Sequence, residues 1–199
     1  GGSRRRSRSE RRRPRGEERG RERSSPRDLD GIDYRVSGPP MGYSPGQRVR
    51  LKNVAGRQNN MEGEVVGNSG SRYRVRLEGN GNVVEVSGRN LCQIVDDAIL
   101  TNLQSRPDLN GRSVRLVSFD TQKGKYEGYL RGSDQPQLIK AENVVLPDYS
   151  RVRIAGLMRN SEMNGEVAEI QSFDQAHGKY VVDLGGREIR IGLRNVFAA

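Results

Sequence analysis

The residues of this chain best suited to binding an anion are basic side chains that occupy every second position of two short stretches. Three basic residues alternate with other residues within 48–52, and three more do so within 72–76. Such alternation places one set of side chains on one face of a β-strand. If both strands belong to one sheet, the cations form a basic stripe that can contact phosphates; the alternative is an ordinary solvated strand face. The six residues are Arg48, Arg50, Lys52, Arg72, Arg74 and Arg76.

Arginine is also concentrated at the start of the chain. Residues 1–28 contain twelve arginines against five acidic residues, so they carry +7 of the formal net charge of +10. Because residues 4–27 consist only of Arg, Ser, Glu, Gly and Pro, we expect a disordered arm. Its Arg-Ser steps resemble the Arg/Ser-rich arms of splicing-associated proteins. The arm residues expected to contact nucleic-acid phosphates are Arg4, Arg5, Arg6, Arg8, Arg11, Arg12 and Arg13.

Side chains suited to covalent or metal chemistry are few. His177 is the only histidine and falls in an expected solvent-facing turn, and the single cysteine, Cys92, excludes an intramolecular disulfide and a multi-cysteine zinc site. The pair Gly79 and Gly81 precedes a strand pattern instead of a helix, so it indicates a turn and not a phosphate-binding loop. With no Trp and only three Phe, a full aromatic cage for a methylated side chain is disfavoured. We therefore expect no enzyme activity, cofactor or metal.

The elements that position these residues come from an internal repeat. Residues 119–126 and 173–180 share the pattern Phe-Asp, a four-residue turn, and Lys-Tyr. Each copy has an Asn-Gly pair before it, at 110–111 and 164–165, and an Asn-Val pair closing it. A weaker first copy lacks Phe-Asp but keeps a tyrosine, Tyr73. Three units of roughly 50 residues are therefore predicted.

The repeated residues suit structural roles. Asn-Gly favours a tight turn, and Asp120 and Asp174 can accept hydrogen bonds from backbone N–H groups two residues on. The repeated tyrosines, Tyr73, Tyr126 and Tyr180, share a face with apolar residues, which favours core packing with the hydroxyl at the rim over ligand contact. For residues 95–103 a helix and a turn followed by a strand remain equally open.

Frequent short alternating strands with glycine-rich turns predict small barrels or sandwiches. The pattern from Arg151 to Val196 resembles the SH3-like barrel repeats related to KOW and Tudor modules, found in tandem in protist and algal proteins. The resemblance implies an all-β chain of three tandem small SH3-like β-barrels behind the disordered basic arm. The expected boundaries are an arm at 1–28, a linker at 29–44 in which Ile32, Tyr34 and Val36 can add an edge strand, and barrels at 45–95, 98–146 and 150–199.

The charge distribution then suggests a function. Residues 45–95 carry eight basic against four acidic residues, whereas the two later units are nearly neutral. We expect a non-enzymatic protein that binds RNA more than DNA through phosphates, with weak sequence specificity, in nuclear RNA processing. The alternative is a protein-interaction adaptor whose second and third barrels bind partners while the arm localises it. No apolar run approaches the ~18 residues of a membrane span, so no membrane association is expected.

Overall fold

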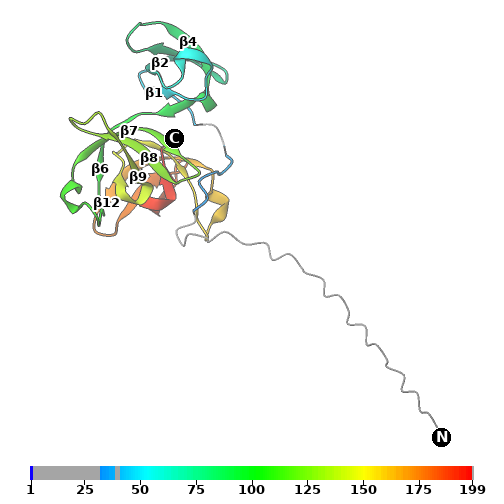
Figure 1. Ribbon diagram of the computed structural model, residues 1–199, viewed down its shortest axis with the longest axis vertical. Coiled ribbons are helices and arrows are strands. Elements are labelled where there is room, and N and C mark those ends of the chain that lie inside the picture. The colour runs from blue at the N-terminus through cyan, green and yellow to red at the C-terminus, as the bar shows by residue number, and fades with distance from the viewer. Residues whose placement is uncertain (2–31, 39–40, 199) are drawn as a thin grey trace. The chain divides into compact units, whose positions relative to one another are not determined.

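The computed structural model describes residue 1 and residues 32–38 and 41–198 (Figure 1). These residues form three antiparallel sheets of five strands each, joined by turns and short 3-10 helices, and contain no α-helix. The predicted all-β class is therefore confirmed, with one sheet for each sequence repeat. The arm lies outside the described residues.

The three sheets share one topology, in which four consecutive strands form a meander and the fifth pairs with the first. Sheet A, in the order β4-β3-β2-β1-β5, comprises β1 (Arg48–Leu51), β2 (Glu62–Ser69), β3 (Arg72–Leu77), β4 (Val83–Ser87) and β5 (Leu91–Gln93). Sheet B, in the order β10-β6-β7-β8-β9, comprises β6 (Val95–Leu100), β7 (Ser113–Asp120), β8 (Lys125–Leu130), β9 (Pro136–Lys140) and β10 (Val144–Val145). Sheet C, in the order β14-β13-β12-β11-β15, comprises β11 (Arg151–Ile154), β12 (Val167–Asp174), β13 (Lys179–Asp183), β14 (Glu188–Gly192) and β15 (Val196–Phe197).

Each sheet must curl on itself. In sheet A the edge strands β4 and β5 are joined by only three residues, the 3-10 helix η2 (Gly88–Asn90). Such a link spans at most about 15 Å between Cα atoms, whereas a flat five-stranded sheet is about 19 Å wide. The other five 3-10 helices are η1 (Gly56–Gln58), η3 (Pro107–Leu109), η4 (Ala141–Asn143), η5 (Ser161–Met163) and η6 (Leu193–Asn195), of which η4 and η6 occupy the place of η2 in sheets B and C.

Each sheet has a β-bulge at the equivalent position of its repeat, and this bulge favours the curvature. The register between the second and third strands of the meander shifts between Val65 and Gly67 in sheet A and between Leu116 and Ser118 in sheet B. In sheet C it shifts between Ile170 and Ser172. An extra residue on one strand bends it and increases the local twist. Each long strand can therefore follow the curl of its sheet.

The helix alternative for residues 95–103 is wrong, and the strand alternative is confirmed by β6. Asp97 has a φ of 58°, in the left-handed region, and the register shifts between Val95 and Ala98. This irregularity moves the apolar side chains out of simple period-two alternation, which explains why the sequence pattern looked partly helical.

The turn chemistry predicted for the repeats is confirmed at Asp120 and Gly111. Oδ1 of Asp120 accepts hydrogen bonds from the N–H groups of Gln122 at 2.9 Å and Lys123 at 3.2 Å. Asp174 differs from the prediction, since it accepts its bond from the N–H of His177, three residues on, at 3.2 Å. Gly111 has a φ of 82°, as an Asn-Gly turn requires.

The asparagine that closes each repeat has the same structural role in all three sheets. Its Nδ2 donates a hydrogen bond to a carbonyl at the end of the first strand of its own repeat: Asn90 to Lys52 at 2.9 Å, Asn143 to Thr101 at 3.1 Å, and Asn195 to Ala155 at 2.9 Å. These bonds hold the 3-10 helix against the first strand, where the fifth strand begins to pair.

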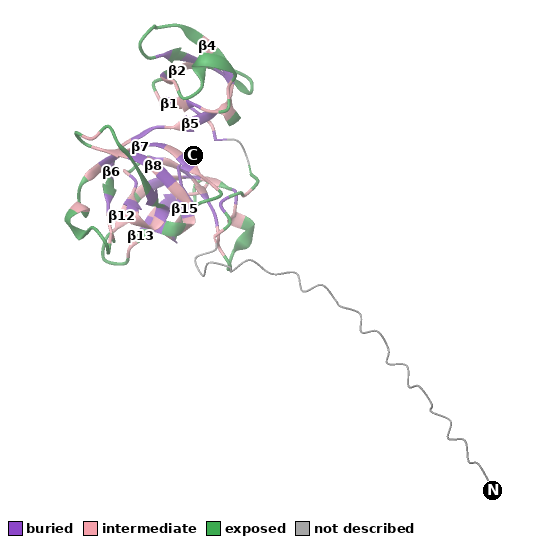
Figure 2. Ribbon diagram, in the orientation of Figure 1, coloured by how far each residue is buried: buried purple, intermediate pink, exposed green. Residues whose placement is uncertain are grey.

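Sheets B and C share one hydrophobic core, whereas sheet A has its own (Figure 2). The repeated tyrosines explain this pairing. The hydroxyl of Tyr126 in sheet B accepts a hydrogen bond from the N–H of Ala198 at 2.9 Å. In return, the hydroxyl of Tyr180 in sheet C accepts one from the N–H of Leu146 at 2.8 Å and donates one to the carbonyl of Val144 at 3.1 Å. Each tyrosine thus holds the chain that follows the last strand of the other sheet. Both rings lie in the core as predicted, but their hydroxyls are buried between the two sheets and not at the rim.

In sheet A the preceding segment supplies the corresponding contact. The hydroxyl of Tyr73 accepts a hydrogen bond from the N–H of Tyr43 at 3.4 Å, and the ring of Tyr43 packs edge-on against that of Tyr73. The Tyr43 hydroxyl donates to the carbonyl of Leu91 at 2.8 Å, and Met41 is buried in the same cluster. The predicted core position of Tyr73 is therefore confirmed.

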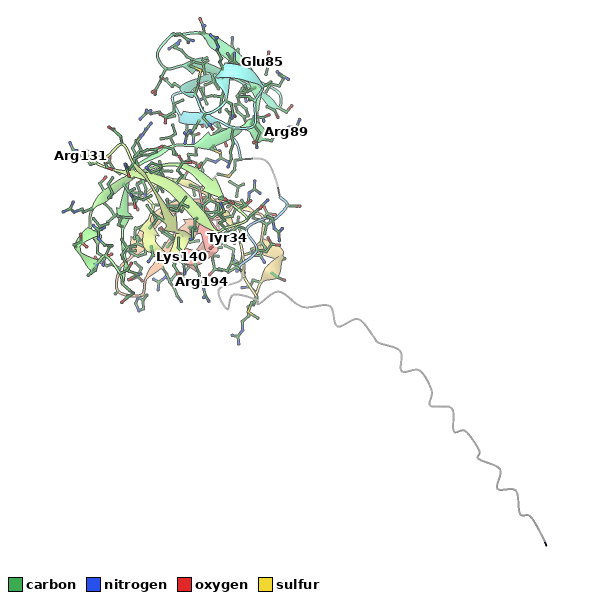
Figure 3. All side chains as sticks on the ribbon, in the orientation of Figure 1. Tyr34, Glu85, Arg89, Arg131, Lys140 and Arg194 are labelled. Atoms are coloured by element: carbon green, nitrogen blue, oxygen red, sulfur yellow. The ribbon has the colours of Figure 1, made fainter. Side chains whose placement is uncertain are left out.

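The edge strand expected around Ile32, Tyr34 and Val36 does not form, because residues 32–38 have no regular structure. This segment, which we call the strap, instead packs on the shared core of sheets B and C. The ring of Tyr34 lies edge-on to Phe119 and Phe197, at centroid distances of 5.1 and 5.4 Å, and its hydroxyl donates to the carbonyl of Arg194 at 2.7 Å (Figure 3). Only glycine fits beneath this ring, since a Cβ at Gly124 would lie 2.6 Å from it.

Candidate nucleic-acid interface

The two strands of the predicted basic stripe do belong to one sheet, but they are not neighbours. In sheet A, β2 lies between β1 and β3, and its glutamates interrupt the row of cations. Glu64 lies directly opposite both Arg48 and Arg76, and Glu62 lies opposite Arg50. The structure therefore divides the six predicted residues into separate groups.

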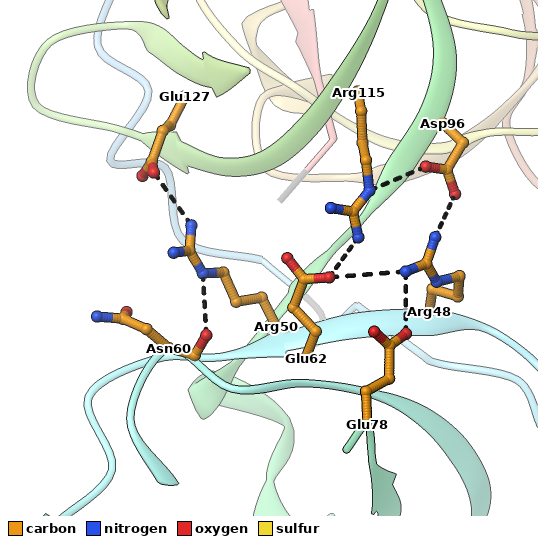
Figure 4. Close-up of polar contacts among 8 residues, drawn as sticks. All are labelled: Arg48, Arg50, Asn60, Glu62, Glu78, Asp96, Arg115 and Glu127. Carbon is orange, nitrogen blue, oxygen red and sulfur yellow. Dashed lines mark hydrogen bonds and ion pairs between the residues drawn. The ribbon is translucent and has the colours of Figure 1, made fainter. Parts of the chain in front are cut away.

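The two arginines of β1 form ion pairs with carboxylates of sheet B, and Arg48 also pairs with carboxylates of sheet A (Figure 4). The guanidinium of Arg48 lies 2.9 Å from Glu78, 3.6 Å from Glu62 and 3.1 Å from Asp96 of sheet B. Burial works against its charged form, but the hydrogen bonds and charges of Glu78 and Asp96 outweigh this and raise the pKa of Arg48.

Arg50 connects the same two sheets. Its guanidinium lies 3.1 Å from Glu127 of β8 and donates to the carbonyl of Asn60 at 3.3 Å. Although burial opposes ionisation of Glu127, the hydrogen bond and charge of Arg50 lower its pKa. Arg115 of β7 completes the network by bonding Glu62 and, at 3.1 Å, Asp96. Arg48 and Arg50 therefore hold sheets A and B together.

The arginines of β3 face solvent. Arg72, Arg74 and Arg76 are all exposed and alternate with buried residues, as predicted. Arg72 forms an ion pair with Glu85 at 3.2 Å, which is exposed and therefore weak. The guanidinium of Arg74 lies over Gly67, where a Cβ would be 2.9 Å from it. The guanidinium of Arg76 has no hydrogen bond or ion pair with any described residue. We call these three residues the β3 row.

Lys52, the sixth predicted residue, lies apart from the β3 row. It lines a cleft of about 250 Å³ between sheets A and B. The charged residues of this cleft are Arg50, Lys52, Asp120, Lys123, Lys125 and Glu127. Sequence reasoning missed the contribution of sheet B, because Lys125 belongs to a repeated Gly-Lys-Tyr pattern that indicated a structural role. The seven arm arginines of the prediction lie outside the described residues.

His177, which was considered for covalent chemistry, has a structural role in its turn. Nδ1 of His177 lies 2.8 Å from Asp174 at an exposed hairpin tip. Within residues 32–38 and 41–198, no three His, Cys, Asp or Glu side chains gather as metal ligands. The same residues include no helix of the length and apolar character that a membrane span requires. No protein-family model and no curated protein sequence matches this chain.

The reactivity of the Cys92 thiol, which lines the cleft, tests whether burial raises its pKa. Burial raises its pKa, although the charges of Lys52 and Arg50 act in the opposite direction. Since the thiolate is the reactive form, a raised pKa leaves less of it at pH 8. We expect folded protein to react with iodoacetamide more slowly than urea-unfolded protein, with the midpoint of the rate profile above the ~8.5 of a free thiol. A folded-state midpoint below that of unfolded protein, measured by mass spectrometry across pH, would contradict this.

Proposed function

We propose that this protein binds RNA in preference to DNA through electrostatic, weakly sequence-specific contacts, in a nuclear RNA-processing setting. We also propose that its three curled sheets are SH3-like barrels of the KOW and Tudor kind. The observation that supports binding best is the β3 row, three exposed arginines on one strand of a curled sheet. The twelve arginines of residues 1–28 add to the positive charge at this end of the chain.

The β3 row is suited to a phosphate backbone. Alternate residues of a strand are about 6.6 Å apart, so the row extends over about 13 Å, enough to reach several successive phosphates. The residues beside it on β4 are Ser87, Glu85 and Val83, and none of them can stack on a base. Without stacking or a rigid set of base-reading groups, contacts to phosphates give affinity with little sequence preference.

Replacement of the β3 row by glutamine tests the proposal. For R72Q/R74Q/R76Q we expect affinity for single-stranded RNA to fall about tenfold at low salt. The slope of log K against log salt should become shallower by about 2, since each lost phosphate contact contributes roughly 0.7. Titrations of the full chain at several salt concentrations measure both quantities.

A matched control removes three exposed arginines from sheet C, in R159Q/R187Q/R194Q. This variant has the same net charge as the first and should bind nearly as well as the wild type. Equal losses in both variants would mean that net charge alone drives binding. Affinity of the wild type that does not change with salt would contradict the proposal and favour the adaptor alternative, in which exposed Leu138, Tyr149 and Met158 of sheets B and C contact a protein.

A further inference from the structure

The cleft between sheets A and B has an unequal balance of charge. Its lining includes four cations, Arg50, Lys52, Lys123 and Lys125, and two carboxylates, those of Asp120 and Glu127. Its volume of about 250 Å³ is below the 300–1,000 Å³ typical of sites for whole small molecules. The cleft therefore suits one charged group of a larger molecule.

Both carboxylates of the cleft already have partners. Glu127 accepts hydrogen bonds from Arg50 at 3.1 Å, from Ser118 at 3.2 Å and from Tyr129 at 3.2 Å. Asp120 accepts two backbone N–H groups of its own turn and forms an ion pair with Lys123 at 3.4 Å. Arg50 and Lys123 are the cations that these carboxylates neutralise.

Two lysines of the cleft form no ion pair, although Lys125 lies directly opposite Asp120, the partner of Lys123, in the pairing of β7 with β8. Neither Lys52 nor Lys125 has an ion pair with a described carboxylate. Lys125 lies directly opposite Lys140 in the pairing of β8 with β9, and like charges in this position repel each other. The carboxylate of Glu142 already forms an ion pair with Lys140 at 3.3 Å. An anion in the cleft would stabilise both Lys52 and Lys125.

We propose that this cleft binds a backbone phosphate of RNA between Lys52 and Lys125. The inference rests on the proposed RNA binding and identifies a second contact point for it. Both points lie on the outer face of the curled sheet A. Arg50, which lines the cleft, alternates outward on β1, and the β3 row alternates outward on β3. Since the cleft is formed by two sheets, binding there also requires the Arg48 and Arg50 network that joins them.

The test compares K52Q/K125Q with K179Q/R187Q in the full chain. Lys179 occupies in sheet C the place of Lys125 in the Gly-Lys-Tyr pattern, and both residues of the control variant are exposed. For K52Q/K125Q we expect RNA affinity to fall about tenfold at low salt and the salt slope to become shallower by about 0.7, as the loss of one neutralised phosphate predicts. Its melting temperature without RNA should change little, because the variant removes both the repulsion between Lys125 and Lys140 and the attraction between Lys125 and Asp120. The control should bind nearly as the wild type does.

The outcomes separate this inference from the proposed function. If K52Q/K125Q binds with wild-type affinity and salt slope while R72Q/R74Q/R76Q binds weakly, the cleft is not a phosphate site and RNA binding stands. If K179Q/R187Q loses as much affinity as K52Q/K125Q, the effect is one of net charge and the cleft proposal is overturned. If the wild type does not bind single-stranded RNA, both proposals fail.

Discussion

Replacing Tyr34 by alanine is expected to lower the free energy of unfolding by about 3–5 kcal/mol, the range measured for large aromatic residues truncated in cores. Tyr34 is only 9% exposed, although it belongs to a segment without regular structure. Its ring packs edge-on against Phe119 of sheet B and Phe197 of sheet C, which stack on each other at a centroid distance of 4.7 Å. Urea denaturation of the full chain, with midpoint and slope both recorded, measures the loss.

Two control variants separate the causes of this loss. Tyr34→Phe keeps the ring and removes the hydroxyl that donates to the carbonyl of Arg194, so a loss of about 1 kcal/mol is expected. Tyr149→Ala truncates a tyrosine that is 72% exposed and should leave stability nearly unchanged. A loss below about 1 kcal/mol for Tyr34→Ala would show that the strap contributes little to the shared core of sheets B and C.

Deleting residues 4–27 is expected to weaken binding of single-stranded RNA by about tenfold or more at low salt. The deletion removes all twelve arginines of residues 1–28 and four glutamates, a net charge of +8. Because counterion release from each phosphate contact depends on salt, the loss should become smaller as the salt concentration rises. Binding titrations that compare the full chain with the shortened one at two salt concentrations measure the effect.

The shortened chain should unfold at the same urea concentration as the full chain, because the residues deleted contain no core-forming side chain. This control shows that any loss of affinity comes from removed charge and not from damage to the sheets. A barely measurable change in affinity would place the RNA contacts entirely on the sheets, on the β3 row and in the cleft.

The repeat itself made much of the fold predictable. Period-two alternation predicted β3 because Tyr73, Val75 and Leu77 face the core while the β3 row faces solvent. Turn chemistry was also local: Asp120 bonds to its own turn, and Gly111 adopts the positive φ that an Asn-Gly pair favours. Such features depend on neighbours in sequence, and a single sequence contains them.

The remaining features depend on contacts between distant residues. Nothing near Arg48 in the sequence shows that it binds Asp96 of another sheet, and nothing near Tyr34 shows that it lies on Phe197. The predicted stripe combined β1 with β3, yet the glutamates of β2 lie between them because of the strand order. Alternation identifies the outward side chains of a strand, but topology and packing between sheets decide which of them remain available to a ligand.

The mutual hydrogen bonds of Tyr126 and Tyr180 have a consequence for the ancestry of this chain. Each repeat from 95 to 198 buries a hydroxyl whose acceptor or donor is encoded in the other repeat. A genetic event that copied or lost one of the two alone would remove the partner of the remaining hydroxyl and expose the apolar core that the two sheets share. The second and third repeats are therefore expected to be inherited together, whereas the first repeat has its own core with residues 41–43 and contacts the second through ion pairs.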